Sequence, residues 1–123
     1  MRVLFSKEAP EPIGPYSQGV EVGGLIFLSG QIGLRPDTGE MANGLVEQTR
    51  QVMKNIAALL RVAGCNYSSV VKSIIYLKNL DDFAEFNKIY SEYFKETPPA
   101  RTTLEVSALP RNALIEIDVI ARK

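Results

Sequence analysis

The last quarter of the chain contains two segments with the side-chain alternation of β-strands, and they constrain the fold more than any other feature. Pro98-Pro99 ends whatever helix precedes it, because proline lacks the amide hydrogen that a helix needs. Residues 101–106 and residues 113–121 alternate in polarity, as strands do. The first strand carries Arg101 and the second carries Glu116. Because partly buried charges need compensation, we expect Arg101 and Glu116 to face the same pocket.

The Gly23-Gly24 pair separates two apolar-rich runs, residues 16–22 and 25–32, and predicts a tight β-hairpin with a primed turn. A two-residue turn fixes the register, which would place Tyr16 opposite Gln31 at the open end of the hairpin. Polar groups collect at this end beside a glycine that lets a ligand or another backbone approach closely. They are Tyr16, Ser17, Gln18, Ser29, Gly30 and Gln31.

A long amphipathic segment follows a Pro- and Gly-containing loop at residues 34–44. In residues 45–63, apolar side chains recur every three or four positions, which predicts a helix. Gly64 is placed to end this helix in the C′ position. Residues 70–77 are rich in Val and Ile on both faces and predict a strand that is covered on both sides.

A second helix is predicted to begin at Asp81 or Asp82, with Glu85 placed to complete a capping box for Asp82. Aromatic side chains lie along one side of this helix, and we expect them to belong to the core. They are Phe83, Phe86, Tyr90, Tyr93 and Phe94.

Together these elements predict an α+β domain with the order β-β-α-β-α-β-β, preceded by a short strand at residues 3–5. Right-handed crossovers would place both helices on one face of a mixed sheet. The opposite face carries too many aliphatic side chains to lie in water, so we expect subunits to associate through it. The link at residues 107–112 is longer than a tight turn, which leaves open whether the last two strands are neighbours.

Composition narrows the classes of function. The chain has 123 residues, enough for one domain spanning residues 1–123. Basic and acidic residues number 14 each, and this zero net charge argues against a dedicated nucleic-acid binder. The absence of histidine excludes a Ser-His-Asp triad, a Cys-His pair and histidine metal ligands, and the single Cys65 excludes an internal disulfide. We expect a cytoplasmic location, because neither a signal peptide nor a membrane-length apolar run occurs.

Four separated motifs run through the chain: Ile13-Gly14-Pro15-Tyr16-Ser17-Gln18-Gly19, Ser29-Gly30-Gln31-Ile32, Pro99-Ala100-Arg101, and Leu109-Pro110 followed by Ile115-Glu116-Ile117. In this order, and over nearly the whole chain, they resemble the RidA/YjgF family of small imine deaminases. The resemblance implies a chorismate-mutase-like fold and a homotrimer whose sheets pack around a central barrel. It also implies sites in the clefts between subunits, which agrees with the uncovered sheet face.

The resemblance further implies hydrolysis of the reactive intermediates 2-aminoacrylate, its tautomer 2-iminopropanoate, and 2-iminobutanoate. The products would be 2-oxo acids and ammonia, and neither a metal nor an organic cofactor is expected. A protonated imine is already electrophilic, so positioning and one acid–base group worth about 10²–10⁴-fold can suffice. Such chemistry fits a chain without histidine.

Three residues are expected to be catalytic by the same resemblance: Glu116, Tyr16 and Ser29. Glu116 would position or deprotonate the attacking water, or hold the imine nitrogen. Tyr16 and Ser29 would hydrogen-bond water or substrate. Each of the three also has an ordinary structural explanation in a surface strand, in hairpin packing or in a strand-end turn. The combination of motifs favours function.

Four more residues are expected to bind the substrate: Arg101, Gly30, Thr103 and Asn87. The planar fork of Arg101 suits bidentate binding of a carboxylate. Gly30 would present its backbone N–H to the ligand. Thr103 stands where some family members have a cysteine, and its backbone N–H is expected to matter more than its side chain. Asn87 matches a position near the family's pocket.

Two other functions remain as alternatives. A non-catalytic regulatory trimer that binds small carboxylates would need Arg101 but not Glu116. Ribonuclease or translation-inhibitor activity has been assigned to some family members, and here it is least favoured because the chain has zero net charge and no histidine. Neither a nucleic acid nor a membrane is an expected partner.

Overall fold

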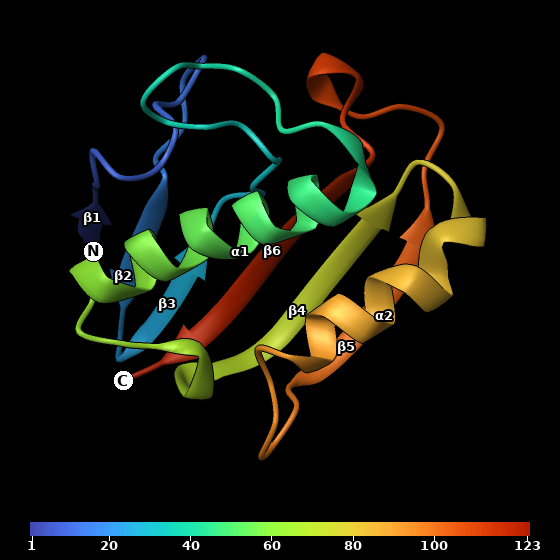
Figure 1. The fold of residues 1–123 in the computed structure, drawn as a ribbon. Helices are drawn as coiled ribbons and strands as arrows, with labels where there is room; N and C mark the ends of the chain where they lie inside the picture. The colour runs from blue at the N-terminus through green and yellow to red at the C-terminus, as the bar shows by residue number, and fades with distance from the viewer.

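The computed structural model describes residues 1–123. It contains a six-stranded mixed sheet with two helices over one face (Figure 1). The strands are β1 (Arg2–Leu4), β2 (Gly19–Val22), β3 (Leu25–Leu28), β4 (Val70–Leu77), β5 (Ala100–Glu105) and β6 (Ile115–Arg122). The helices are α1 (Gly44–Val62) and α2 (Phe83–Ser91), with 3-10 turns η1 (Tyr67–Ser69), η2 (Leu80–Asp82) and η3 (Pro110–Asn112). The predicted α+β class, the order of elements and the short first strand are confirmed.

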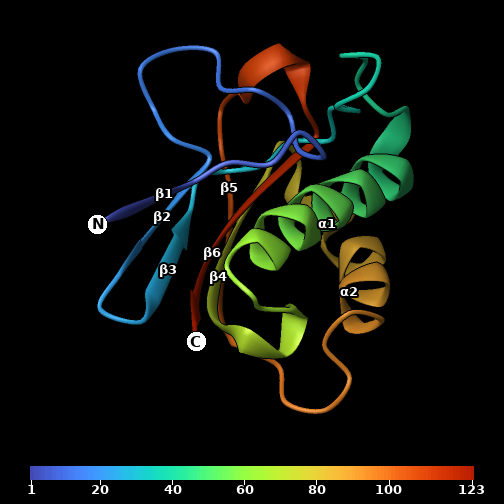
Figure 2. The ribbon, with the colours of Figure 1, turned by 90° about the vertical axis from the view of Figure 1, so that its left-hand side faces the viewer.

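The strand order in the sheet is β1-β2-β3-β6-β4-β5. Only β4 and β5 run parallel, and α2 makes the crossover between them. β6 lies between β3 and β4 and is antiparallel to both. The last two strands of the chain are therefore separated by β4. Figure 2 shows α1 and α2 on the same side of the sheet, as the connectivity predicts.

The β2–β3 hairpin has the register that Gly23-Gly24 predicts, with Val20 opposite Phe27. Pairing continues as far as Ser29, whose N–H donates to the carbonyl of Gln18 at 2.9 Å. Beyond this point the prediction of a Tyr16–Gln31 pair is wrong. Gln31 instead exchanges two backbone hydrogen bonds with Ile117 of β6, at 2.8 and 3.0 Å. The hairpin opens there because the backbone of Gln31 pairs with β6 and not with the other arm of the hairpin.

Helix α1 covers the centre of the sheet and ends as predicted. Gly64 has a φ of +75°, and the N–H groups of Gly64 and Cys65 donate to carbonyls of the last turn. Two buried polar side chains of α1 hold the chain beneath it. Asn55 donates to the carbonyls of Ile32 and Leu34 at 3.2 and 3.0 Å, and Gln48 accepts from the N–H of Leu114 at 2.8 Å.

Helix α2 differs from its prediction at the N-terminus. Asp82 makes no capping hydrogen bond, so the predicted capping box is wrong. The chain enters through η2, where Asn79 accepts from the N–H of Asp81 at 2.9 Å, and Asp82 already has helical backbone angles. Most of the aromatic stripe belongs to the core, because Phe86, Tyr90 and Phe94 are buried. Phe83 is the exception and is 38% exposed.

The face of the sheet opposite the helices, called the open face below, has no layer over it in Figure 2. It carries apolar side chains from five of the strands together with two carboxylates. They are Val22, Leu25, Phe27, Ile74, Leu104, Glu116, Asp118 and Ile120. Val22 and Leu25 are 50% and 41% exposed, which is unusual for a cluster of large apolar groups. Neither helix combines the length and the hydropathy of a membrane-spanning segment.

Candidate active site

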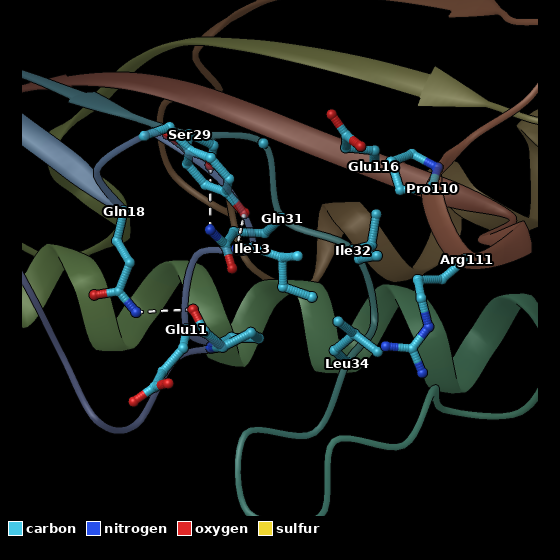
Figure 3. A pocket seen from close by; sticks show the side chains of 13 residues that line it. Glu11, Ile13, Gln18, Ser29, Gln31, Ile32, Leu34, Pro110, Arg111 and Glu116 are labelled. Carbon is cyan, nitrogen blue, oxygen red and sulfur yellow. Dashed lines mark hydrogen bonds between the residues drawn. The ribbon is translucent and has the colours of Figure 1, made fainter.

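A pocket of about 560 Å³ lies where the β2–β3 hairpin opens (Figure 3). The hairpin arms supply its polar wall, β6 supplies a carboxylate, and η3 supplies the rim. Its lining includes Tyr16, Gln18, Ser29, Gly30, Arg111 and Glu116. Of the polar residues predicted at the open end, only Ser17 is absent from the lining. We call this cavity the Glu116 pocket.

The buried amide of Gln18 holds the outer wall of this pocket. Its Oε1 accepts from the N–H of Ser6 at 2.7 Å, and its Nε2 donates to the carbonyls of Ser6 and Pro10 at 3.1 and 2.9 Å. The side chain is 2% exposed, so these bonds are shielded from water. The proline-rich segment before the hairpin is thereby fixed against the pocket mouth, as the dashed contact of Gln18 in Figure 3 shows.

Ser29 and Tyr16 present hydroxyl groups of different kinds. Ser29 Oγ donates to the carbonyl of Ser17 at 2.6 Å, which commits its proton and leaves its lone pairs available as acceptors. The Tyr16 hydroxyl accepts a long hydrogen bond of 3.4 Å from the N–H of Ile13, and Tyr16 is 51% exposed. Ser29 is therefore a fixed acceptor, whereas the Tyr16 O–H remains free to donate.

Gly30 lies directly against the carboxyl group of Glu116. A methyl group added at Gly30 would lie 2.9 Å from Cδ of Glu116 and closer still to its Oε2. Any side chain at position 30 would displace the Glu116 carboxyl group, and the Gly30 N–H donates to no protein acceptor. This pair brings an open backbone donor next to a carboxyl group.

Burial raises the pKa of the Glu116 carboxyl above its usual value, and the neighbouring Asp118 raises it further. Asp118 also has a raised pKa because of burial, although the Tyr76 hydroxyl donates to its Oδ2 at 3.0 Å and opposes the shift. Glu116 and Asp118 are two residues apart on β6 and share the open face. Glu116 is therefore a carboxyl group that holds its proton more readily than an exposed one.

Arg101 lies elsewhere, at the edge of the sheet beneath α2. Its guanidinium carbon is 5.0 Å from the ring centroid of Tyr90 and 5.5 Å from those of Phe83 and Phe86. None of the ion pairs in the chain includes Arg101, so no carboxylate lies within 4.0 Å of it. A half-buried cation without an acidic neighbour is prepared to receive an anion.

The prediction that Arg101 and Glu116 face the same pocket is wrong within one chain. On β4, Ser73 pairs with Arg101 and Tyr76 pairs with Glu116. Ser73 and Tyr76 are three residues apart, so their side chains point to opposite faces of the sheet. Arg101 consequently faces the helices, whereas Glu116 belongs to the open face.

Two further predicted residues lie with Arg101. Thr103 is on the same face of β5, and Asn87 is one helical turn after Phe83 on α2. The Oγ1 of Thr103 and the Oδ1 of Asn87 are buried and have no hydrogen-bond partner. Because such orphaned oxygens are rare in proteins, this edge is a second candidate place for a polar ligand. We call these three residues the Arg101 cluster.

Comparison with known proteins finds relatives and solved structures that match nearly the whole chain. The family model described as Endoribonuclease L-PSP matches residues 6–123. Reactive Intermediate Deaminase A of Arabidopsis thaliana, a chloroplastic protein, is 49% identical over 120 residues, which cover 97% of this chain and 64% of the relative. The structure of RidA from the Antarctic bacterium Psychrobacter superposes with a TM-score of 0.98 at 36% identity and covers 100% of both chains. That of E. coli TdcF with bound serine superposes with a TM-score of 0.96 at 35% identity, covering 100% of this chain and 99% of TdcF.

The chain belongs to the RidA/YjgF family. Its fold is that of the RidA structure, which confirms the family resemblance in the four sequence motifs. Within this RidA/YjgF chain, those motifs supply Tyr16, Ser29, Gly30 and Glu116 to the pocket and Arg101 to the separate cluster. The residues contain no group of three or more His, Cys, Asp or Glu side chains arranged to hold a metal.

Two features of the candidate site were not predicted from the sequence. Arg111 and Asn112 form part of η3 and have positive φ angles of 58° and 56°, and Arg111 lines the pocket rim. The Leu109-Pro110 motif signals a turn there but does not show that its side chains reach the pocket. The aromatic stripe of α2 was assigned to the core alone, although three of its rings contact Arg101.

Proposed function

We propose that this RidA/YjgF chain hydrolyses small 2-imino acids, with 2-iminopropanoate and 2-iminobutanoate as its substrates, to 2-oxo acids and ammonia. The observation that carries the proposal is the Arg101 cluster, a half-buried guanidinium with no acidic partner beside two orphaned buried oxygens. That arrangement suits a carboxylate, which an arginine can bind through two parallel hydrogen bonds. The name of the Arabidopsis relative and the serine bound to TdcF support the same substrate class.

The proposal requires more than one copy of the chain. Arg101 and Glu116 lie on opposite faces of the sheet, so one small ligand cannot reach both within a protomer. We propose a homotrimer in which the open faces pack around a central barrel. Each site would then combine the Arg101 cluster of one protomer with the Glu116 pocket of the next. The exposed apolar side chains of the open face support this assembly.

In the proposed mechanism, Arg101 binds the substrate carboxylate and so places the imine carbon beside Glu116. The protonated form of Glu116, which burial favours by raising the pKa of this carboxyl group, donates its proton to the imine nitrogen. The resulting carboxylate takes a proton from water, whose oxygen attacks the imine carbon. Glu116, reprotonated in this step, then protonates the amine nitrogen of the tetrahedral intermediate and takes the proton of its hydroxyl group. Breaking of the C–N bond releases ammonia and leaves the C=O bond of the 2-oxo acid.

Three other residues would assist these steps. The Gly30 N–H and the Tyr16 hydroxyl can donate hydrogen bonds to the oxygen of the tetrahedral intermediate, where negative charge develops as its hydroxyl group loses a proton and the C–N bond breaks. Ser29 Oγ, whose proton is committed to Ser17, can accept a hydrogen bond from the attacking water. Binding and orientation would supply the rest, as in other reactions of already electrophilic substrates.

A coupled assay tests the proposal directly. A pyridoxal-phosphate dehydratase generates 2-aminoacrylate, and release of the 2-oxo acid is followed with and without this protein. Wild type should accelerate release, whereas Arg101→Ala and Glu116→Gln should each reduce the acceleration by about 10²-fold or more. Matched controls are Arg50→Ala and Glu92→Gln, which remove an exposed ion pair outside the site and should behave as wild type.

Two results would contradict the proposal. If wild type binds a small carboxylate through Arg101 but never accelerates release, the chain is a binding protein and the non-catalytic alternative holds. If RNA is cleaved after rigorous repurification and Glu116→Gln abolishes that cleavage, the pocket serves ribonuclease chemistry instead.

A further inference from the structure

Three aromatic rings surround the guanidinium of Arg101, and we call Phe83, Phe86 and Tyr90 the aromatic platform. All three ring centroids lie within 5.5 Å of the Arg101 guanidinium carbon. A cation at that distance is attracted by the negative face of an aromatic ring. We propose that the aromatic platform is the positioning device of Arg101 and takes the place of an acidic partner. This inference rests on the proposed role of Arg101 in binding the substrate carboxylate.

The absence of an acidic partner gives the platform its significance. A carboxylate beside Arg101 would orient the guanidinium but would also occupy the N–H donors that a substrate needs and neutralise its charge. Aromatic faces attract the cation without accepting its in-plane N–H groups. The platform therefore holds Arg101 in place while its donor edge remains open to the carboxylate of a ligand.

Two of the rings are themselves firmly held. Phe86 and Tyr90 are 0% and 5% exposed, and their centroids are 5.2 Å apart. The Tyr90 hydroxyl shares a hydrogen bond of 2.6 Å with Ser73, the residue of β4 that pairs with Arg101. The same strand position thus supports both the backbone of Arg101 and one ring that its side chain contacts.

Phe83 is the outer ring and the one that can be changed without opening the core. Phe83 is 38% exposed and lies in the first turn of α2. β5 is an edge strand, so without the platform the long Arg101 side chain would be free to populate other rotamers. Ordering that side chain in advance lowers the entropy cost of binding, which is how positioning raises affinity.

The test replaces Phe83 by phenylalanines with one, two or three ring fluorines, which keep the shape but progressively weaken the attraction for a cation. Two quantities are measured in the full protein: the Kd for 2-oxobutanoate by calorimetry, and kcat and KM in the coupled assay. We expect Kd and KM to rise stepwise to about threefold to tenfold at three fluorines, with kcat within about twofold. The same series at Phe5, an exposed residue after the opposite edge strand β1, should change nothing.

Two substitutions separate this electrostatic role from packing. Phe83→Leu should raise Kd about as much as the fully fluorinated ring does, whereas Phe83→Tyr, which keeps the π face, should restore wild-type values. If fluorination leaves Kd and KM flat while Arg101→Ala abolishes binding, the platform is packing alone and this inference is overturned, but the proposed function stands. If wild type binds no carboxylate and Arg101→Ala changes nothing, both are overturned.

Discussion

Arg101 and Glu116 lie on strands that flank β4, yet their side chains project from opposite faces of the sheet. The helix side of the sheet therefore carries a cation with open donors, and the open side carries a carboxyl group with a raised pKa. Neither side of the sheet alone has all the groups that the proposed reaction needs. The proposed reaction would therefore depend on how copies of the chain meet, and variants of the two sides would report on different protomers.

Gly30→Ala tests the contact between Gly30 and Glu116. The added methyl group would overlap the Glu116 carboxyl group, so this side chain must move. We expect kcat/KM to fall by about 10²-fold or more, because small displacements of an acid–base group are costly. Enzyme kinetics check this with four proteins: wild type, Gly30→Ala, Glu116→Ala and the double variant that carries both substitutions. Gly30→Ala should have no further effect where Glu116 is already absent, and additive losses would contradict the account.

Stability should depend on pH through Glu116. Burial raises its folded-state pKa above the usual value of 4.5, so between the two pKa values the folded chain binds more protons than the unfolded chain. Stability from this group is therefore present at acidic pH and is lost as pH rises through that interval. Glu116→Gln removes the buried charge, so its Tm should exceed that of wild type at neutral pH.

This Tm advantage should shrink as the pH falls toward 4.5, where wild-type Glu116 is protonated. Differential scanning fluorimetry of both proteins across this range measures the difference directly. Glu92→Gln, whose carboxylate is 52% exposed, serves as the control and should show no such trend. An advantage that grew on acidification would mean that Glu116 is stabilised as an anion.

Thr103→Val should separate stability from ligand binding. The valine keeps the shape of threonine and removes the orphaned Oγ1, so the ligand-free protein should gain about 1 kcal/mol of unfolding free energy. If Oγ1 is kept for a ligand, the Kd for a small carboxylate should rise about threefold to tenfold. Urea unfolding and calorimetry measure the two effects, and Thr97→Val in an exposed loop is the control. A less stable variant with unchanged Kd would show that Oγ1 is structural.

Local pattern predicted most of the fold, because neighbours in the sequence determine it. The Gly23-Gly24 turn set the hairpin register, and Gly64 marked the end of α1. Two of the failures have a common physical cause. Gln31 leaves the hairpin for Ile117, and Arg101 turns away from Glu116, because strands distant in the sequence decide both pairings.

The motifs identified which residues belong to the candidate site but not how they are arranged. The face that one strand presents depends on register, and a shift of one residue reverses every side chain. The link at residues 107–112 carried no signal that β4 would lie between the last two strands. The role of Phe83, Phe86 and Tyr90 was hidden for a similar reason, because helical spacing alone does not distinguish a core stripe from a platform.

Recovery of activity in mixed oligomers tests the central claim most directly. Arg101→Ala and Glu116→Ala chains are co-expressed in equal amounts, and all the oligomers that form are purified together and assayed for imine hydrolysis. Sites shared between protomers should return activity to roughly one quarter of wild type, because each site draws its two residues from different chains at random. Wild type mixed equally with the double variant should give the same fraction. No recovery in the first mixture, with about one half of wild-type activity in the second, would place both residues in the site of a single chain and contradict the account.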